Sequence, residues 1–478
     1  MLTKETRERL KTAQIVSVED LVPPEHILRK IDRYISFEFI YELVEPLYST
    51  ETGRPSIDPI ILFKMVLLQH FYGLGSMRRT VREIETNMAY RWFLGLDLFD
   101  AVPHFGTFSK NYKRRFEGTP LFEQIFSRIL EQCMMHGFVD CEVLFVDATH
   151  VKANANRNQK IKKQARREVL EVERRLRREI NQEREAHDKP PFDDDQEPPR
   201  KEETKSPNDD DCGMFHKGEH KREFAYSVQT SCDVHGWVVG YSVHPGNHHD
   251  SRTFYALYDK LKPFHPKKIV MDAGYKVPML MEYLLEEGVE PILPYTRPKG
   301  NSNGFTTKDF VYDEMFDCVL CPHDQILTYS TTNRQGYHIF KSDPHICVHC
   351  TDLARCTKSR DHQKIHQVHI YHEAMERCKD LEHGIENRIL YKLRKHTIER
   401  CFAFAKEQHG MRYTRMNGRK AMEMKAALTF TCLNIKKLVR MLEYRDKITL
   451  NSSSFLTVLR QKIKNVLPYQ KRPTMQAA

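Results

Sequence analysis

The sequence predicts a multidomain protein in which an α-helical N-terminal domain is followed by an α/β core with two insertions. At 478 residues, the chain is too long for one ordinary domain. Apolar residues recur at helical spacing up to about residue 135, and runs typical of buried strands begin near residue 141. We therefore expect a helical domain over residues 1–135, an α/β domain over 136–445 and a basic, flexible tail over 446–478.

Composition narrows the class of protein. The net charge is +10 and the isoelectric point is near 8.9, which favours a polyanionic partner. A hydrophobic content of 40% and an aromatic content of 10% are typical of a globular chain. The N-terminus shows no secretory signal, and the most apolar stretch, residues 60–74, contains Lys64, Gln69 and His70. We expect a cytosolic protein without membrane contact.

Helix start signals divide the N-terminal domain. Asp58-Pro59 predicts an N-cap with proline at the first helical position, and Gly75-Ser76 ends that helix and caps the next. A further helix begins near Thr107. The second helix carries Arg78 and Arg79, which are candidate DNA contacts in a helix-turn-helix-like domain. A helical packing domain with a solvated basic face fits the same pattern equally well.

Five apolar runs in the next part predict the strands of one sheet, with helices expected from Asp250 and over residues 277–287. The runs are Cys141–Asp147, Phe224–Cys232, Trp237–His244, Lys268–Asp272 and Glu290–Leu293. The resulting order β-β-β-α-β-α-β is that of a ribonuclease H-like core. In that order the first and fourth strands are neighbours.

Two aspartates end those neighbouring strands, and a third acid lies on a later helix. Asp147 ends the first run, Asp272 ends the fourth, and Glu399 falls inside the helical stretch 391–408. An aspartate at a strand end often only caps a turn, so the specificity comes from the combination. Carboxylates suit Mg²⁺, and two such ions about 4 Å apart can cut and rejoin phosphodiesters. We predict that these three acids form a catalytic metal site.

The helix around Glu399 supplies cations beside these acids. Lys406 follows Glu399 by seven residues and therefore lies on the same helix face. Tyr391, Arg394 and Lys406 can then bind DNA phosphates near the metal ions. An ordinary amphipathic helix with solvated charges is the alternative. Asp250 is interpreted first as a helix cap and second as a neighbour of the site.

The first insertion, residues 158–212, is highly charged. Lys160–Glu185 predicts a helix with a thin apolar stripe, and the rest of the segment predicts a loop without a core. We interpret the segment as a solvated insertion, with a short coiled-coil contact to a second copy of the chain as the alternative.

The second insertion, residues 311–360, contains five of the 12 cysteines. Two C-x2-C pairs lie on either side of a predicted hairpin, a pattern typical of a zinc ribbon. Four thiolates would leave no open coordination position, so the zinc would be structural. Reduced thiols without a metal are the alternative, and the pattern leaves open which four of the five would bind. The five are Cys318, Cys321, Cys347, Cys350 and Cys356.

Four stretches resemble the bacterial insertion-sequence transposases of the DDE class. They are Phe145–Asn156, Pro245–Ser251, Met271–Tyr275 and the helix Tyr391–Lys406. The helix is similar to the Tyr-Arg-Glu-Lys signature of that group, although four residues, and not three, separate Arg394 from Glu399. The helical N-terminal domain and the cysteine cluster resemble the same group, so the likeness covers nearly the whole chain.

The resemblance implies a DNA transposase. It implies a ribonuclease H-like catalytic domain in which Asp147, Asp272 and Glu399 hold Mg²⁺ or Mn²⁺. It also implies that terminal inverted repeats are cut by hydrolysis and joined to target DNA by transesterification, in a homodimer or larger complex on double-stranded DNA. A non-catalytic, zinc-containing DNA-binding protein derived from a transposase and a nuclease that cannot rejoin strands are the alternative functions.

Overall fold

The computed structural model describes residues 15–49, 56–165, 168–193, 200–218, 221–296 and 304–466, with side chains as far as residue 448. The chain forms two compact units. Unit 1 contains the residues up to Phe138, residues 404–411 and the chain from Met424, and unit 2 contains Val139–Ala403 and Arg412–Glu423.

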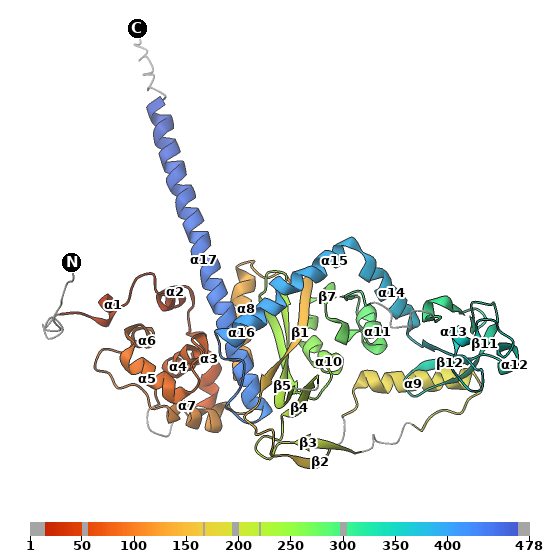
Figure 1. Ribbon diagram of the computed structural model, residues 1–478. Coiled ribbons are helices and arrows are strands. Elements are labelled where there is room, and N and C mark those ends of the chain that lie inside the picture. Colours follow the sequence, from red (N-terminus) through yellow and green to blue (C-terminus); the bar gives the residue numbers. More distant parts are fainter. Residues whose placement is uncertain are drawn as a thin grey trace, which may run out of the picture. The chain divides into compact units, whose positions relative to one another are not determined.

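Unit 1 is helical (Figure 1). Asp58 accepts a 2.7 Å hydrogen bond from the Ile60 N–H, and Pro59 begins the helix that follows. Ser76 caps the next helix through its hydroxyl, so both predicted starts are confirmed. The helices are α1 (Val18–Leu21), α2 (Ile27–Tyr34), α3 (Phe39–Val44), α4 (Pro59–Phe71), α5 (Met77–Thr86), α6 (Met88–Leu94), α7 (Gly106–Asn111) and α8 (Leu121–Met135), with short turns η2 (Glu45–Leu47) and η3 (Tyr112–Phe116).

Helix α4 lies at the centre of unit 1 because it is apolar on most of its faces. Among its buried side chains are Leu62, Phe63 and Leu68. The last helix, α17 (Arg419–Val466), begins in unit 2 and continues into unit 1. It does not end near residue 446, where the tail was predicted to begin. The predicted tail from residue 467 onward lies outside the described residues.

Unit 2 is built on a six-stranded sheet in which β5 pairs with β1, β4 and β6. The strand order is β4-β5-β1-β7-β8, with β6 also beside β5; β1, β7 and β8 are parallel, and β5 is antiparallel to its partners. Five of these strands confirm the predicted runs to within a few residues. They are β1 (Val143–Lys152), β5 (Lys221–Asp233), β6 (Val238–Pro245), β7 (Lys268–Val270) and β8 (Glu290–Ile292), and the sixth is β4 (Gly213–Lys217).

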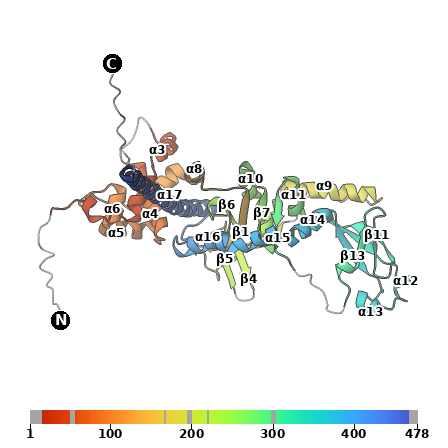
Figure 2. The ribbon, with the colours of Figure 1, turned by 90° about the horizontal axis from the view of Figure 1, so that it is seen from above.

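Helices cover both faces of this sheet. Figure 2 shows α10 (Asp250–Leu261) on one side and α15 (Ile385–Lys392) on the other. Gly240 on β6 lets α10 approach closely, since a Cβ there would come within 2.9 Å of Leu261. The remaining helices of the unit are α11 (Pro278–Glu286), α14 (His372–His383) and α16 (Ile398–Glu407), with the short turns η4 (Lys262–Phe264), η5 (Ala273–Tyr275) and η7 (Leu393–His396).

Two predicted elements differ in extent. Strand β1 does not end at Asp147 but continues to Lys152, because antiparallel pairing with β5 persists over its whole length. The single helix predicted over residues 391–408 is broken into α15, η7 and α16. The break lies at Thr397, whose backbone leaves helical geometry at φ −110° and ψ −99°.

The second insertion forms a separate five-stranded antiparallel sheet in the order β13-β12-β11-β10-β9. The predicted hairpin is confirmed as β11 and β12. A small core forms from Phe310, Val319, Leu327, Phe340 and Val368. The elements are η6 (Thr307–Asp309), β9 (Val311–Asp313), β10 (Cys318–Leu320), β11 (Ile326–Thr332), β12 (Tyr337–Lys341), β13 (Ile365–His369), α12 (Pro344–Cys347) and α13 (Leu353–Cys356).

The first insertion is more structured than its charge predicts. Its helix, α9 (Glu171–Ala186), begins eleven residues later than predicted, and residues 161–165 form β2 instead. Strand β2 (Ile161–Ala165) pairs with β3 (Lys201–Lys205), which falls in the predicted loop. The prediction failed because lysines on β2 lie across from glutamates on β3, as in the pairing of Lys163 with Glu203 and the 3.0 Å ion pair of Lys162 with Glu202.

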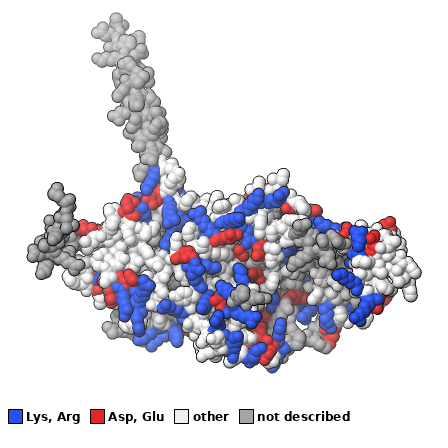
Figure 3. Space-filling view, viewed as in Figure 1, with Lys and Arg blue, Asp and Glu red and all other residues white. Residues whose placement is uncertain are grey.

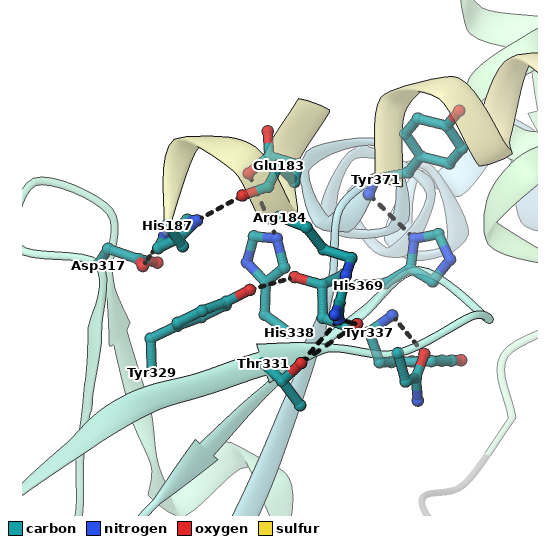
Figure 4. Close-up of polar contacts among 12 residues, drawn as sticks. Glu183, Arg184, His187, Asp317, Tyr329, Thr331, Tyr337, His338, His369 and Tyr371 are labelled. Atoms are coloured by element: carbon teal, nitrogen blue, oxygen red, sulfur yellow. Dashed lines mark hydrogen bonds and ion pairs between the residues drawn. The ribbon is translucent and has the colours of Figure 1, made fainter. Parts of the chain in front are cut away.

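Helix α9 packs on the sheet of the second insertion and is not solvated on all sides (Figure 4). Arg184 is only 8% exposed. Its Nη1 donates to Thr331 Oγ1 at 2.8 Å and to the Thr332 carbonyl at 2.7 Å, and its Nε donates to the Pro190 carbonyl. Its guanidinium lies 3.9 Å from the ring centre of Phe192. Arg184 thus fixes the C-terminal end of α9.

His187, just beyond α9, extends the same contact. Its Nε2 lies 2.7 Å from the Asp317 carboxylate, and its ring stacks on Tyr329 with 3.9 Å between ring centres (Figure 4). On the helix itself, Ile180 is buried and Leu176 lies against Gly336 in the β11–β12 turn. The apolar stripe of α9 is therefore covered within the chain, and the predicted solvated insertion is wrong.

We predict that Arg184→Ala loosens α9 while Arg178→Ala does not. Loss of Arg184 leaves the buried Thr332 carbonyl with only a long, 3.5 Å hydrogen bond from the Thr331 hydroxyl, which costs about 2 kcal/mol. Arg178 is exposed and makes only a 3.4 Å ion pair with Glu171, worth well under about 1 kcal/mol. Hydrogen exchange of the α9 amides should quicken by about thirty-fold in the Arg184 variant. Equal exchange in both variants would contradict this role for Arg184.

Candidate active site

The candidate site lies where β7 ends and β1 continues. The parallel pairing of these strands stops at Phe145 and Val270. Asp147 lies two residues beyond that pair on β1, and Asp272 two residues beyond it on the chain that leaves β7. This register brings the two aspartates next to each other, in agreement with the effect of the Asp272 charge on the pKa of Asp147.

Asp147 is a partly buried carboxylate that faces one cation. Its Oδ2 accepts a 2.7 Å hydrogen bond from Nη2 of Arg394, and its Oδ1 accepts one of 2.8 Å from the Ala148 N–H. Burial raises the pKa of Asp147, and the charge of Asp272 adds to that shift. The guanidinium of Arg394 opposes it. The two side chains form an ion pair in which Arg394 is buried and Asp147 is partly exposed.

Arg394 has more donors than its contact with Asp147 uses. Its side chain is 5% exposed, and in the described part of the chain its Nε and Nη1 have no hydrogen-bond partner. The guanidinium lies 5.6 Å from the ring centre of Tyr391. Burial raises the pKa of Tyr391, and the charges of Asp272 and Asp147 raise it further. Two donor nitrogens thus remain available beside the carboxylates, and guanidinium groups suit phosphate oxygens.

Asp272 combines the predicted site position with a cap. Its Oδ1 accepts a 2.8 Å hydrogen bond from the Gly274 N–H, which starts η5. The turn holds the carboxylate directly after β7, partly exposed. Both interpretations of a strand-end aspartate, as a cap and as part of the site, therefore fit this residue.

Asp250 lies near these two aspartates. The sequence analysis interpreted Asp250 first as a helix cap and only second as a neighbour of the site. The predicted cap is displaced by one residue: His249 caps α10, and Asp250 is the first residue of the helix. Its carboxylate accepts a long, 3.4 Å hydrogen bond from Ser227. Burial, together with the charges of Asp272 and Asp147, raises the pKa of Asp250 to about 6. The only sequence signal was the acid's place in the stretch Pro245–Ser251.

Tyr275, the last residue of η5, lies near the carboxylates. Its side chain is fully buried, and its hydroxyl has no hydrogen-bond partner among the described residues. Burial raises the pKa of Tyr275, and the charges of Asp250, Asp147 and Asp272 each raise it further. The hydroxyl therefore lies close to all three carboxylates. The sequence analysis gave Tyr275 no role, and its only signal was its place in the stretch Met271–Tyr275.

Glu399 is not brought into this cluster by a direct contact. It is exposed in the first turn of α16, two residues beyond the break at Thr397. Within the described residues, no hydrogen bond or ion pair joins it to Asp147 or Asp272. Lys406 lies seven residues later on α16 and is partly buried, but it falls in unit 1, whereas Glu399 falls in unit 2.

Basic side chains expected at DNA occur in unit 1 as well. Arg78 and Arg79 are exposed on α5; the guanidinium of Arg78 lies over the ring of Phe105, and Arg79 lies 3.6 Å from Glu83. On the face that Figure 3 draws, lysine and arginine side chains are interspersed with acidic ones. Charge alone therefore does not delimit a DNA contact surface on that face.

Four of the five clustered cysteines lie near one another. Cys321, Cys347 and Cys350 are close enough for their charges to raise the pKa of Cys356, although burial is the larger cause. Cys321 accepts a 3.4 Å hydrogen bond from the His323 N–H. Cys318 points to the other face of β10 from Val319, and its pKa is raised by burial and by Asp313 and Asp317.

One further group has metal-ligand spacing. Among the described residues, ligand atoms of three residues within 4.8 Å of one another occur only at Glu314, His372 and Glu373. The aspartates of the candidate site and the four neighbouring thiols are spread more widely. No helix in the described part of the chain combines the length and apolar character needed to cross a bilayer.

Comparison with known families gives two matches. Residues 16–114 match a family described as Transposase domain (DUF772), and residues 320–439 match one described as Transposase DDE domain. The second match contains Arg394 and Glu399. Two parts of the chain thus match transposase domains, one of them a DDE domain, which confirms the resemblance predicted from the sequence.

Solved structures give only distant similarity, and no curated protein sequence matches the chain. The piggyBac transposase synaptic complex with hairpin DNA has a TM-score of 0.35 and 12% identity, covering 94% of this chain and 87% of that chain. The Mos1 transposase paired-end complex with the left transposon end has a TM-score of 0.16 and 11% identity, covering 51% and 61%. Similarity at this level carries no argument about function.

The raised pKa of Asp250 predicts that the metal-free protein becomes less stable as the pH rises. Because its folded pKa of about 6 exceeds the unfolded value, the folded state binds the proton more tightly, and stability falls as pH rises from about 4 to about 6. In EDTA, Asp250→Asn should therefore stabilise unit 2 by on the order of 2 kcal/mol at pH 7 and by little at about pH 4. Thermal unfolding checks this, with the exposed Asp259→Asn as the control, and a gain that is equal at both pH values would contradict it.

Proposed function

We propose that the protein is a DNA transposase that binds the terminal inverted repeats of its element, cleaves their strands and transfers them to target DNA. The observation that carries this proposal is the meeting of Asp147 and Asp272 at the end of β7. The order β1, β5, β6, α10, β7, α11 and β8 is the one expected of a ribonuclease H-like core and supports the proposal, as does the match to a transposase DDE domain.

We infer that Asp147, Asp272 and Glu399 hold Mg²⁺, or Mn²⁺, during the reaction. The fit rests on charge: one guanidinium, that of Arg394, lies at a cluster of carboxylates, and the pKa values of two of them, Asp147 and Asp250, are raised by burial and by the charges of their neighbours. Bound ions of this kind activate the attacking water or 3′-hydroxyl and stabilise the leaving 3′-oxygen. Glu399 is exposed and has no partner in the described part of the chain, so its carboxylate is available as the third ligand.

The remaining site residues then bind and orient DNA. Arg394 holds one oxygen of Asp147 and keeps two donors for a phosphate. Tyr391 and Lys406 extend this phosphate contact, and Arg78 and Arg79 act as DNA contacts of a helix-turn-helix-like domain in unit 1. Because two element ends must be joined together, the working form is a homodimer or larger complex on double-stranded DNA. The reaction takes place in the cytosol.

We also infer that the second insertion is a zinc ribbon with a structural Zn²⁺. The thiols that lie together, Cys321, Cys347, Cys350 and Cys356, supply the four ligands. Cys318 is the spare thiol, since it is buried on the opposite face of β10. A four-thiolate site supplies folding energy to a segment whose own core is small.

The proposed reaction predicts that Asp147→Ala abolishes cleavage. Losing one metal-binding carboxylate removes several kcal/mol of transition-state stabilisation, so the rate should fall about a thousand-fold or more. Binding to DNA should be retained, because the DNA contacts lie on other residues. The measurement is metal-dependent nicking and strand transfer on DNA that carries the sequences flanking this gene.

Two controls separate the alternatives in that assay. Asp259→Ala changes an exposed carboxylate on α10 and should cleave as the unaltered protein does. If the unaltered protein binds end DNA but never cuts it, the non-catalytic DNA-binding function is correct. Cut ends without joined products would indicate a nuclease that cannot rejoin strands.

The proposed zinc site predicts different effects for two cysteines of one C-x2-C pair. Cys321→Ser should lose the metal and expose the second insertion to proteolysis. Cys318→Ser should keep about one zinc per chain. Metal content by atomic spectrometry, together with limited proteolysis, measures both effects. Equal zinc content in the two variants would rule out this choice of ligands.

A further inference from the structure

The cluster at the end of β7 contains a carboxylate that the three predicted metal-binding acids do not include. We propose that Asp250 is an additional carboxylate ligand of the divalent-metal site that contains Asp147 and Asp272. This proposal rests on the proposed function, and it assigns a metal-binding role to a residue on α10, on the opposite face of the sheet from Arg394.

The first turn of α10 is fixed on the sheet beside Asp147. Nε2 of Gln229 on β5 donates to the Asp250 carbonyl at 2.6 Å and to Thr253 Oγ1 at 2.5 Å. Gln229 pairs with Ala148 in the register of β1 and β5. Since Ala148 directly follows Asp147, the backbone of Asp250 is held one strand away from it.

The same turn also packs on the segment that carries Asp272. Tyr275 in η5 meets Phe254 edge to face, with 6.0 Å between ring centres. Phe254 is one helical turn after Asp250, and Asp272 caps η5. The contacts of Gln229 and Phe254 therefore hold the first turns of α10 beside the strand that carries Asp147 and the turn that Asp272 caps, without depending on any charge.

Two groups with unused hydrogen-bonding capacity point to a ligand at this place. The fully buried hydroxyl of Tyr275 has no partner in the described part of the chain, and neither do Nε and Nη1 of Arg394. Buried polar atoms are normally paired. A hydrated divalent cation brings both positive charge for the carboxylates and water oxygens for these donors.

The spacing of the carboxylates fits two ions better than one. The three aspartates do not have ligand atoms that all lie within 4.8 Å of one another, as a single ion would require. Two ions about 4 Å apart spread their ligands over a wider site. With two ions, a carboxylate from α10 would be a ligand of one ion, and Asp147 and Asp272 would supply the other aspartate ligands.

The test measures Mn²⁺ binding to the full chain without DNA, by titration calorimetry and by the rise in unfolding temperature on adding Mn²⁺. Asp250→Asn should weaken Mn²⁺ binding about ten-fold or more. Asp147→Asn should also weaken it, and Asp259→Asn, on the exposed end of α10, should not. The metal-free Asp250 variant should unfold at or above the temperature of the unaltered protein, which excludes misfolding as the cause.

Each outcome decides a different point. If Asp147→Asn loses Mn²⁺ but Asp250→Asn binds it as before, the role of Asp250 is wrong and the proposed site stands. If neither variant changes binding, the site itself is wrong. A crystal structure with Mn²⁺ gives a check that needs no variant. An Asp250 oxygen at coordination distance, about 2.1 Å, supports the proposal, and an ion bound without Asp250 overturns it.

Discussion

The ion pair between the buried Arg394 and the partly exposed Asp147 is the contact on which the arrangement of the candidate site depends. It joins a strand near the start of unit 2 to a helical turn that follows both insertions, 247 residues later. The pair holds the buried guanidinium of Arg394 against the carboxylate of Asp147. The pair therefore fixes η7 against β1. Because Glu399 follows Arg394 by only five residues, the pair also restricts where Glu399 can lie.

Much of the fold could be predicted because its signals are local. Asp58-Pro59 and Ser76 start helices through hydrogen bonds that span two or three residues. The strand runs and the β11–β12 hairpin depend on side-chain alternation and a turn between neighbours. Asp147 and Asp272 could be placed together because the strands were predicted from local signals and their order is that of a ribonuclease H-like core. In that order the two strands are neighbours.

The remaining features depend on partners far away in the sequence. Strand β1 continues beyond Asp147 because β5 pairs with it as far as Lys152. No sequence feature near residue 147 predicts this pairing. The break at Thr397 divides a run that looks helical throughout, and it separates Arg394 from Glu399. Asp250 and Tyr275 enter the cluster only because α10 packs on β5 and η5, so neither could be assigned from its own neighbourhood.

The docking of α9 has a consequence for how such a chain can be shortened. The two insertions are separated in sequence by much of the core sheet, yet Arg184 and His187 of one are satisfied by Thr332 and Asp317 of the other. Deleting residues 158–212 alone would remove the Arg184 hydrogen bond to the Thr332 carbonyl and expose the ring face of Tyr329 on which His187 stacks. A minimal version of this protein should therefore discard both inserts or neither, and natural variants that lack one should lack its counterpart too.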